Sequence, residues 1–197
     1  HTEFLAHLCD VQQVVMMLTC PELSVVPLTI HIPISDVPKA ITRELFHSTA
    51  QILNEGLRRD FGIAEPRISV AGLNPHASEG GKIGREDIDQ ITPWIAELQS
   101  AGLSIAGPHS ADTLFHPKAR ASYDAALCMY HDQALIPIKT LDFSGGVNVT
   151  LGLPIVRTSP DHGTAFDIAG QGLADPSSMV QAIVCADRMI RARQNAN

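Results

Sequence analysis

Short apolar runs alternate with amphipathic helical segments along most of the sequence. Residues 13–19 (QVVMMLT) and 124–130 (DAALCMY) are apolar runs of strand length. Between them, residues 35–60 carry apolar side chains at helical spacing, and Gly62 follows as a helix-ending residue. Strands that alternate with helices predict an α/β fold, in which helices flank a parallel or mixed sheet.

The composition excludes several classes of partner. The 197-residue chain has a formal net charge of −7 and no run of Lys and Arg, so we expect no nucleic-acid partner. No apolar stretch approaches the roughly 20 residues that span a membrane, and nothing resembles a targeting signal, so we expect no membrane partner and a cytoplasmic location. The four cysteines are widely spaced and are expected to be reduced, without a zinc-type pair.

Three histidines stand at the ends of the strands predicted for residues 24–31, 67–73 and 124–130, or a few residues beyond. They are His31, His76 and His131. In an α/β fold the carboxyl ends of the strands meet at one edge of the sheet, where ligand sites form. Three neutral imidazoles there would bind zinc or a similar metal and leave a position for water or substrate. The alternative is chance, because nine histidines in 197 residues leave several near strand ends.

Lys139, Asn148 and Arg157 lie on successive segments of a stretch that is otherwise poor in charge. An unpaired cation among apolar segments is costly, so the two cations predict an anionic ligand. Arg157 can grip a phosphate or carboxylate with a fork of donors, while Lys139 adds a point charge and Asn148 adds orientation. The rival interpretation is a structural ion-pair network with the nearest acids, which are Asp132, Asp142 and Asp161.

A glycine-containing segment covers residues 162–172 (HGTAFDIAGQG). Its glycines permit a ligand to approach the backbone closely, and Asp167 could accept hydrogen bonds from a ribose diol. The segment does not contain the GxGxxG phosphate fingerprint. A loop in which Asp167 merely caps a short helix would have the same composition.

Several of these motifs together resemble a known enzyme family. They are HTEFLA at residues 1–6, GLNPHASEGG at 72–81, ADTLF at 111–115, YHDQ at 130–133 and GVNVTLGLPIVRTSPDHGTAFDIAGQG at 146–172. The whole chain closely resembles the 4-hydroxythreonine-4-phosphate dehydrogenases, which have the isocitrate and isopropylmalate dehydrogenase-like fold. The resemblance implies NAD- and metal-dependent oxidation of 4-phosphohydroxy-L-threonine at its 3-hydroxyl. Decarboxylation then gives 3-amino-2-oxopropyl phosphate, for pyridoxine and pyridoxal phosphate biosynthesis.

The resemblance also implies roles for individual residues. It makes the three histidines the ligands of a metal site that is shared across a homodimer, with zinc favoured over cobalt or magnesium. It gives the cofactor as NAD, with NADP as the alternative. It assigns His1, Thr2, Lys139, Asn148 and Arg157 to the substrate, with Lys139 also catalytic. It assigns His162, Gly163, Thr164 and Ala165 to the adenine of the cofactor, Asp167 to its ribose and Ile168 to backbone contact.

Relatives in this family carry a long segment before HTEF, so we expect this chain to lack most of the first domain. We predict that residues 1–170 form a metal- and substrate-binding, dimerising domain, and that the helix in residues 171–197 packs on that first domain. Residues 179–190 should then expose an apolar stripe. Two alternatives stay open: a paralogue acting on threonate or erythronate 4-phosphate, and a metal-binding dimerisation fragment without catalysis.

Overall fold

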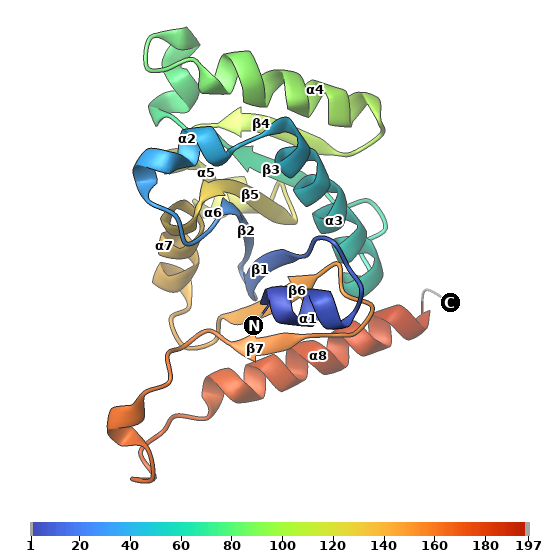
Figure 1. Cartoon of the computed structure of the whole chain (residues 1–197), viewed down its shortest axis with the longest axis vertical. Coiled ribbons are helices and arrows are strands. Elements are labelled where there is room, and N and C mark those ends of the chain that lie inside the picture. The colour runs from blue at the N-terminus through green and yellow to red at the C-terminus, as the bar shows by residue number, and fades with distance from the viewer. Residues whose placement is uncertain (1, 196–197) are drawn as a thin grey trace.

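The computed structural model describes residues 2–195, and for Thr2 and Glu3 only the backbone. Seven strands form one mixed sheet in the order β4-β3-β5-β2-β1-β6-β7 (Figure 1). Strands β4, β3, β5 and β2 run parallel to one another, whereas β1, β6 and β7 are joined by antiparallel pairings. The strands are β1 (Val15–Cys20), β2 (Leu23–Thr29), β3 (Ile68–Ala71), β4 (Ile105–His109), β5 (Ala125–Tyr130), β6 (Val147–Leu151) and β7 (Thr158–Pro160).

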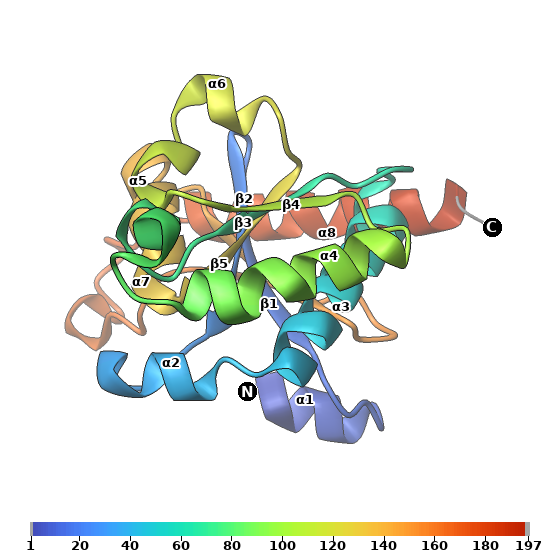
Figure 2. The ribbon, with the colours of Figure 1, turned by 90° about the horizontal axis from the view of Figure 1, so that it is seen from above.

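Helices cover both faces of this sheet (Figure 2). The helices are α1 (Thr2–Leu8), α2 (Val37–Ala40), α3 (Arg43–Phe61), α4 (Thr92–Ser100), α5 (Ala111–Leu114), α6 (Pro117–Arg120), α7 (His131–Leu141) and α8 (Ser177–Asn195). Shorter helical turns are η1 (Ile34–Asp36), η2 (Pro75–Gly81), η3 (Asp87–Ile91) and η4 (Phe166–Ile168). The predicted α/β class, with a mixed sheet flanked by helices, is confirmed.

Two apolar clusters fill the space between the sheet and its helices. The larger one packs α3, α4 and α8 against one face, with Phe46, Leu53 and Met189 buried in it. The smaller one packs α5 and α7 against the other face around Leu114 and Ile138. Strands β2, β3 and β5 between them are buried on both sides, which explains why they appear in the sequence as continuous apolar runs rather than as alternating patterns.

The single long helix predicted for residues 35–60 is in fact two helices, and the prediction of one helix is wrong. The backbone of Ile41 is extended after α2, and α3 begins at Arg43. The Thr42 side chain caps α3 by accepting a hydrogen bond from the Leu45 amide at 3.2 Å. At the other end Gly62 has a φ of 68° and closes the helix in the left-handed conformation, as predicted.

Two prolines lead to predictions about the backbone, and the structure agrees with only one of them. Thr92-Pro93 predicts an interruption of the helical segment at residues 85–101, and the type of helix changes there: the π-helical turn η3 ends at Ile91 and α4 begins at Thr92, with Pro93 in its first turn. A proline within an apolar run predicts an edge strand or a bulge, but Pro27 lies in an interior strand and pairs with Cys128 of β5. The ladder between β2 and β1 reaches only Val25, so at Pro27 the strand is paired on one side.

A Gly-Pro pair after an apolar run predicts that the strand at residues 103–106 ends there, and for Gly107-Pro108 this prediction is wrong. Strand β4 runs through both residues to His109, with a register shift in its pairing to β3. Gly107 has a φ of 143°, and a Cβ atom built there would lie 2.6 Å from the Val70 carbonyl oxygen. Glycine is therefore needed for close approach of the two strands.

Replacing Gly107 by alanine should lower the free energy of unfolding by about 1–3 kcal/mol, because the new methyl group meets backbone that cannot move away cheaply. Urea denaturation of the chain measures this change. Gly102→Ala is the matched control, since Gly102 also has a positive φ, of 93°, but no atom lies within 4 Å of a Cβ there. Equal losses in the two variants would contradict the role of the Val70 contact.

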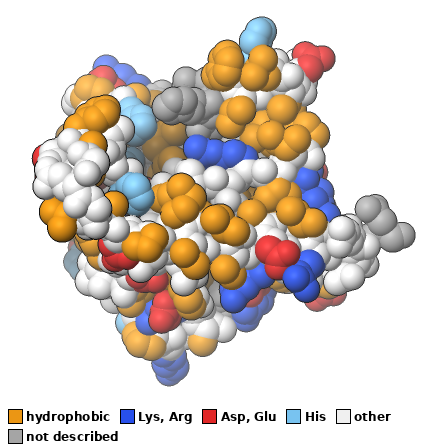
Figure 3. All heavy atoms as spheres, turned by 90° about the horizontal axis from the view of Figure 1, so that it is seen from below, with side chains coloured by type: hydrophobic (Ala, Val, Ile, Leu, Met, Phe, Trp, Pro, Cys, Tyr) orange, Lys and Arg blue, Asp and Glu red, His pale blue; other side chains and the backbone are white. Residues whose placement is uncertain are grey.

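Helix α8 exposes a row of apolar side chains. Met179, Val180, Ile183, Val184 and Ile190 are each between 38% and 62% exposed, which confirms the predicted apolar stripe on residues 179–190. Figure 3 shows hydrophobic side chains gathered on the face that bears α8. Packing of this helix on a further domain stays a prediction. Among the described residues, no helix is long and apolar enough to cross a membrane.

Candidate functional site at the carboxyl ends of the parallel strands

The three predicted histidines follow three strands that lie next to one another. Strand β5 pairs in parallel with β3 on one side and with β2 on the other. His31 comes two residues after β2, His131 directly after β5, and His76 five residues after β3. Because the strands are parallel, their carboxyl ends lie at one edge of the sheet, which is where α/β proteins bind ligands.

His31 and His131 lie side by side at this edge. Their ring centroids are 5.7 Å apart, and the two rings are tilted by 45°. Nδ1 of His131 is 2.7 Å from Oδ1 of Asp132, an arrangement that orients the ring and leaves Nε2 available. A metal-binding histidine commonly has such a carboxylate partner on its second nitrogen. The donor set at this position therefore fits a divalent metal.

His76 is presented by an unusual turn. From His76 to Gly80 every residue has a positive φ, between 42° and 68°, so η2 is a left-handed turn rather than an ordinary helix. Left-handed backbone costs roughly 1–2 kcal/mol for each non-glycine residue, so surrounding contacts must stabilise the turn. His76 is exposed. The hydrogen bond that the Ser110 hydroxyl donates to Asp112, and to a smaller extent the nearby His76, hold the pKa of Asp112 below its ordinary value.

Two hollows flank Tyr130 at this edge. One, of about 250 Å³, contains His31, His131 and Asp132, and the other, of about 390 Å³, contains His76 and Asp112. Tyr130 lines both. Within the described part of a single chain, no three His, Cys, Asp or Glu side chains are arranged to hold a metal ion. The chain thus brings two of the three histidines together and keeps the third in the adjoining hollow.

Arg157 and Asn148 are in contact, as their predicted grouping requires. Nη1 of Arg157 donates to Oδ1 of Asn148 at 3.3 Å and to the hydroxyl oxygen of Thr150 at 3.2 Å. Burial lowers the pKa of Arg157, because the partly buried guanidinium is desolvated. Among the described residues no carboxylate pairs with Arg157, so the ion-pair alternative does not hold for this residue. A partly buried cation with only neutral partners suits an anionic ligand.

Lys139 has a different environment. Its Nζ lies 2.7 Å from Oδ2 of Asp161, so for this residue the ion-pair alternative is what the structure shows. Nζ also lies 5.5 Å from the centre of the Phe143 ring. In the described residues no hydrogen bond or ion pair joins Lys139 to Arg157 or Asn148. Lys139 instead lines a cavity of about 640 Å³ together with Asp161 and the segment that follows.

That following segment is the predicted cofactor loop, which projects from the body at the lower left of Figure 1. Four of its six predicted contact residues line the same cavity as Lys139, namely His162, Gly163, Ala165 and Ile168. Thr164 and Asp167 are exposed and do not line it. Ala165 has a φ of 45°. The structure therefore places Lys139 beside most of this loop.

Two predicted substrate residues are at the start of the chain. His1 lies outside the described residues. Thr2 is the first residue of α1, and its side chain also lies outside the description. Their assignment to the substrate stays a prediction.

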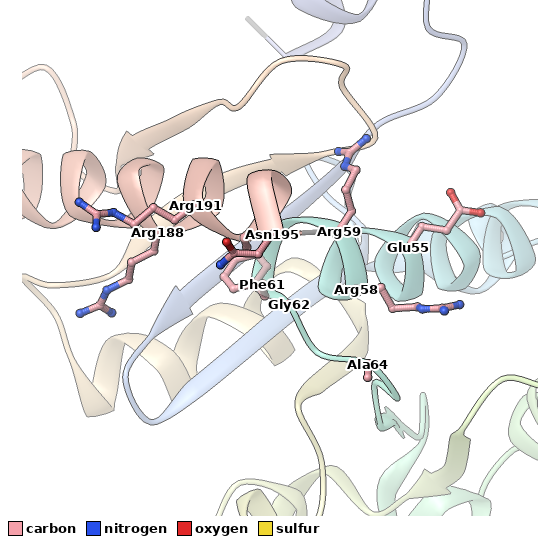
Figure 4. A pocket seen from close by; sticks show the side chains of 10 residues that line it. Glu55, Arg58, Arg59, Phe61, Gly62, Ala64, Arg188, Arg191 and Asn195 are labelled. Atoms are coloured by element: carbon pink, nitrogen blue, oxygen red, sulfur yellow. The ribbon is translucent and has the colours of Figure 1, made fainter. Parts of the chain in front are cut away.

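Another hollow, of about 1020 Å³, lies between the C-terminal ends of α3 and α8. Four arginines line it, Arg58, Arg59, Arg188 and Arg191. Figure 4 shows that their side chains point in different directions rather than toward one point. Arginines near helix C-termini are expected from the helix dipole alone. This cavity is remote from the histidines in the fold and has no convergent polar group.

Sequence reasoning missed some parts of the site. Helix α7, which begins at His131 and carries Lys139, was not predicted, because Pro137 and the apolar run around it hid the helical period. Asp87, which is fully buried, was not singled out, because Glu86 and Asp89 flank it and the sequence of three acids is typical of an exposed helix start. Asp112 was also missed, and only its place after β4 could have indicated it.

The fold and this edge define an α/β protein with a polar site at the carboxyl ends of adjacent parallel strands. The family model of the pyridoxal phosphate biosynthetic protein PdxA matches residues 1–186. The chain therefore belongs to the PdxA family of pyridoxal phosphate biosynthetic proteins.

Individual relatives agree with this assignment. The 4-hydroxythreonine-4-phosphate dehydrogenase of Ruegeria sp. is 60% identical over 194 residues, which cover 98% of this chain and 60% of the relative. A crystal structure of the enzyme of that name from Klebsiella pneumoniae matches with a TM-score of 0.88 and 41% identity, over 96% of this chain and 57% of that one. A terephthalate 1,2-cis-dihydrodiol dehydrogenase from Burkholderia xenovorans matches with a TM-score of 0.77 and 32% identity, over 95% and 60%. The chain spans about 60% of the length of its curated relatives.

Proposed function

We propose that the complete protein is a cytoplasmic, NAD-dependent and metal-dependent 4-hydroxythreonine-4-phosphate dehydrogenase. In this reaction 4-phosphohydroxy-L-threonine is oxidised at its 3-hydroxyl and then loses carbon dioxide to give 3-amino-2-oxopropyl phosphate. The observation that carries the proposal is the side-by-side placement of His31 and His131 at the ends of two adjacent parallel strands. These relatives are named as dehydrogenases, which supports the reaction class.

The metal would be held by His31, His131 and His76. The hydrogen bond that Nδ1 of His131 donates to Oδ1 of Asp132 fixes the orientation of the His131 ring, so that Nε2 is directed away from the carboxylate. A bound divalent metal, with zinc favoured, supplies Lewis acidity that lowers the pKa of a coordinated hydroxyl group. Within one chain His76 lies in a separate hollow from His31 and His131. We therefore propose that the metal site is shared across a homodimer, in which the third histidine comes from the partner chain.

The anionic ends of the substrate would be held by cations of this chain. Arg157 offers guanidinium donors that only neutral groups engage, so it can bind a phosphate or carboxylate bidentately. Lys139 lies in the cavity lined by the cofactor loop, and substrate binding there would compete with Asp161 for its ammonium group. A lysine in that position can stabilise the negative charge that develops during decarboxylation.

The cofactor would lie along the projecting loop. NAD supplies the hydride acceptor. Backbone and side-chain groups of His162, Gly163 and Ala165 line the cavity from one side. The exposed carboxylate of Asp167 has no partner among the described residues, so it is free to accept hydrogen bonds from ribose hydroxyls.

A substrate panel with the complete protein tests the proposal. NAD reduction should be fastest with 4-phosphohydroxy-L-threonine, should fall on chelation of divalent metal, and should return when zinc is restored. Threonate and erythronate 4-phosphate belong in the panel because the terephthalate dihydrodiol dehydrogenase shows that this fold serves other hydroxylated substrates. Preference for either compound would assign the protein to the paralogous function. Metal binding and dimerisation without NAD reduction on any of the three would leave only a binding role.

Arg157→Ala should lower kcat/KM of the complete protein about 100-fold, because the charge-assisted hydrogen bonds to the substrate anion are lost. Steady-state kinetics with 4-phosphohydroxy-L-threonine measure the effect. Arg157→Lys keeps the charge but not the fork of donors and should recover only part of it. Arg58→Ala, an exposed arginine on α3, is the matched control and should keep wild-type kinetics. Wild-type kcat/KM in Arg157→Ala would contradict the assignment.

A further inference from the structure

Asp87 is a carboxylate with no solvent exposure at the start of η3, and it faces the turn that carries His76. Its Oδ1 accepts a hydrogen bond from the Leu73 amide at 2.7 Å. Its Oδ2 accepts from the Asn74 amide at 3.0 Å, from the Asn74 side chain at 3.2 Å and from the Ser78 hydroxyl at 2.7 Å. One side chain thus holds both the entry to the left-handed turn and a residue within it.

All four groups that face Asp87 donate hydrogen bonds. An ionised carboxylate only accepts, so it can satisfy every one of them, whereas an asparagine amide would turn an NH₂ group toward at least one donor. No cation pairs with Asp87 among the described residues. A buried charge without a counter-ion is costly, so a carboxylate at this position indicates that the surrounding backbone needs the hydrogen bonds that it accepts.

One other carboxylate holds the turn: Glu86 accepts a hydrogen bond from the Asn74 side chain at 2.8 Å, but among the described residues no hydrogen bond joins it to the left-handed residues 76–80. Its conformation is unfavourable at His76, Ala77 and Ser78, each with a positive φ. The backbone hydrogen bond from the Ala77 amide to the Asn74 carbonyl is local to the turn and moves with it. Gly72 gives close approach, because a Cβ there would lie 3.0 Å from Cα of Ala77. Asp87 is thus the carboxylate that connects both the entry of the turn and Ser78 within it to the start of the following helix, whereas Glu86 reaches only the entry.

We infer that Asp87 is a positioning residue for His76, which holds the left-handed turn in the conformation that presents this histidine as a metal ligand. The inference rests on the proposed metal site. The carboxylate does not touch the metal; it fixes the backbone from which the ligand projects. Loss of partners that orient metal ligands typically costs 10–100-fold in metal affinity.

The experiment uses the full 197-residue chain with Zn²⁺ as the probe. Zn²⁺ affinity is measured by competition with a chromophoric chelator, and amide hydrogen exchange of residues 73–81 is measured without metal. The variants are Asp87→Asn, Ser78→Ala, which removes one donor and leaves the carboxylate in place, and His76→Ala. Asp89→Asn is the matched control, since Asp89 lies two residues further on, is exposed and pairs with Arg85. Asp60→Asn controls for loss of stability at a remote place.

Asp87→Asn should weaken Zn²⁺ binding at least 10-fold and speed exchange at residues 73–81, with a smaller effect of the same kind in Ser78→Ala. Asp89→Asn and Asp60→Asn should keep wild-type Zn²⁺ affinity. Wild-type affinity and wild-type exchange in Asp87→Asn would overturn the inference, and if that variant does not fold, the same result in Ser78→Ala would overturn it. If His76→Ala keeps wild-type affinity, the ligand role of His76 fails, and the exchange of residues 73–81 alone decides whether Asp87 holds the turn.

Discussion

Replacing His131 by alanine should remove both the bound metal and the turnover of the complete protein. His131 provides one of the two imidazoles that the chain places 5.7 Å apart, and a site with one ligand fewer binds a divalent metal far more weakly. Because loss of an outer partner alone costs roughly 10–100-fold in affinity, loss of a ligand should cost about 1000-fold or more. Metal content by mass spectrometry and the initial rate of NAD reduction measure the two effects.

Two further variants test whether the effect is specific to the imidazole of His131. Asp132→Asn keeps the imidazole but weakens the contact that orients it, so metal affinity should fall by the smaller outer-partner amount, roughly 10–100-fold. His7→Ala removes an exposed histidine of α1 and should change neither quantity. A His131→Ala protein that retained both metal content and turnover would show that the assignment of this edge as a metal site is wrong.

The sequence was sufficient to predict which edge of the sheet carries the polar site. Continuous apolar runs marked β2, β3 and β5 as buried strands, and their shared direction follows from the alternation with helices. The histidines after them therefore had to lie at one edge. The grouping of Arg157 with Asn148 was also predictable, because the two residues lie on successive segments: Asn148 is on β6, and Arg157 directly precedes β7, which pairs with β6.

Other features depend on contacts between residues that are distant in the chain. The choice of Asp161 as partner of Lys139, over Asp132 or Asp142, is made by the packing of α7 beside the end of β7. The left-handed turn at His76 depends on Asp87, and nothing in the sequence around either residue indicates that the turn and this carboxylate are in contact. Local propensity argues against such a turn, so only the tertiary contacts could have revealed it.

A second large effect is expected at Asp60, whose side chain has no solvent exposure. Its Oδ1 accepts hydrogen bonds from Nε of Arg59 at 2.8 Å and from Nε of Arg193 at 2.6 Å. The same arginines donate to the Leu153 and Pro154 carbonyl oxygens, so one carboxylate connects α3, α8 and the loop before β7. Removing one partner of a buried pair typically costs about 3–5 kcal/mol; because the Arg59 and Arg193 side chains are 42% and 20% exposed, we expect the lower end, about 3 kcal/mol, for Asp60→Ala.

Urea denaturation of the 197-residue chain at pH 7 measures this loss. Asp187→Ala is the matched control, because Asp187 forms an exposed pair with Arg191 on the same helix α8 and should contribute less than about 1 kcal/mol. An Asp60→Ala protein within 1 kcal/mol of the wild type would mean that the two arginines find other partners. The network would then be dispensable for the packing of α8.

The pH dependence of this network has a definite sign. Burial disfavours the charged form of Asp60, but the hydrogen bonds from Arg59 and Arg193 outweigh it and hold the pKa of Asp60 below its ordinary value. A lowered folded-state pKa contributes stability that is present above the unfolded-state pKa, about 3.9, and is lost as the pH falls through the folded-state pKa. The stability gap between wild type and Asp60→Asn should therefore be constant from pH 7 to 5 and shrink below about pH 4. Other carboxylates titrate in both proteins, so the difference between the two profiles isolates Asp60, and a gap that widened on acidification would contradict the assignment.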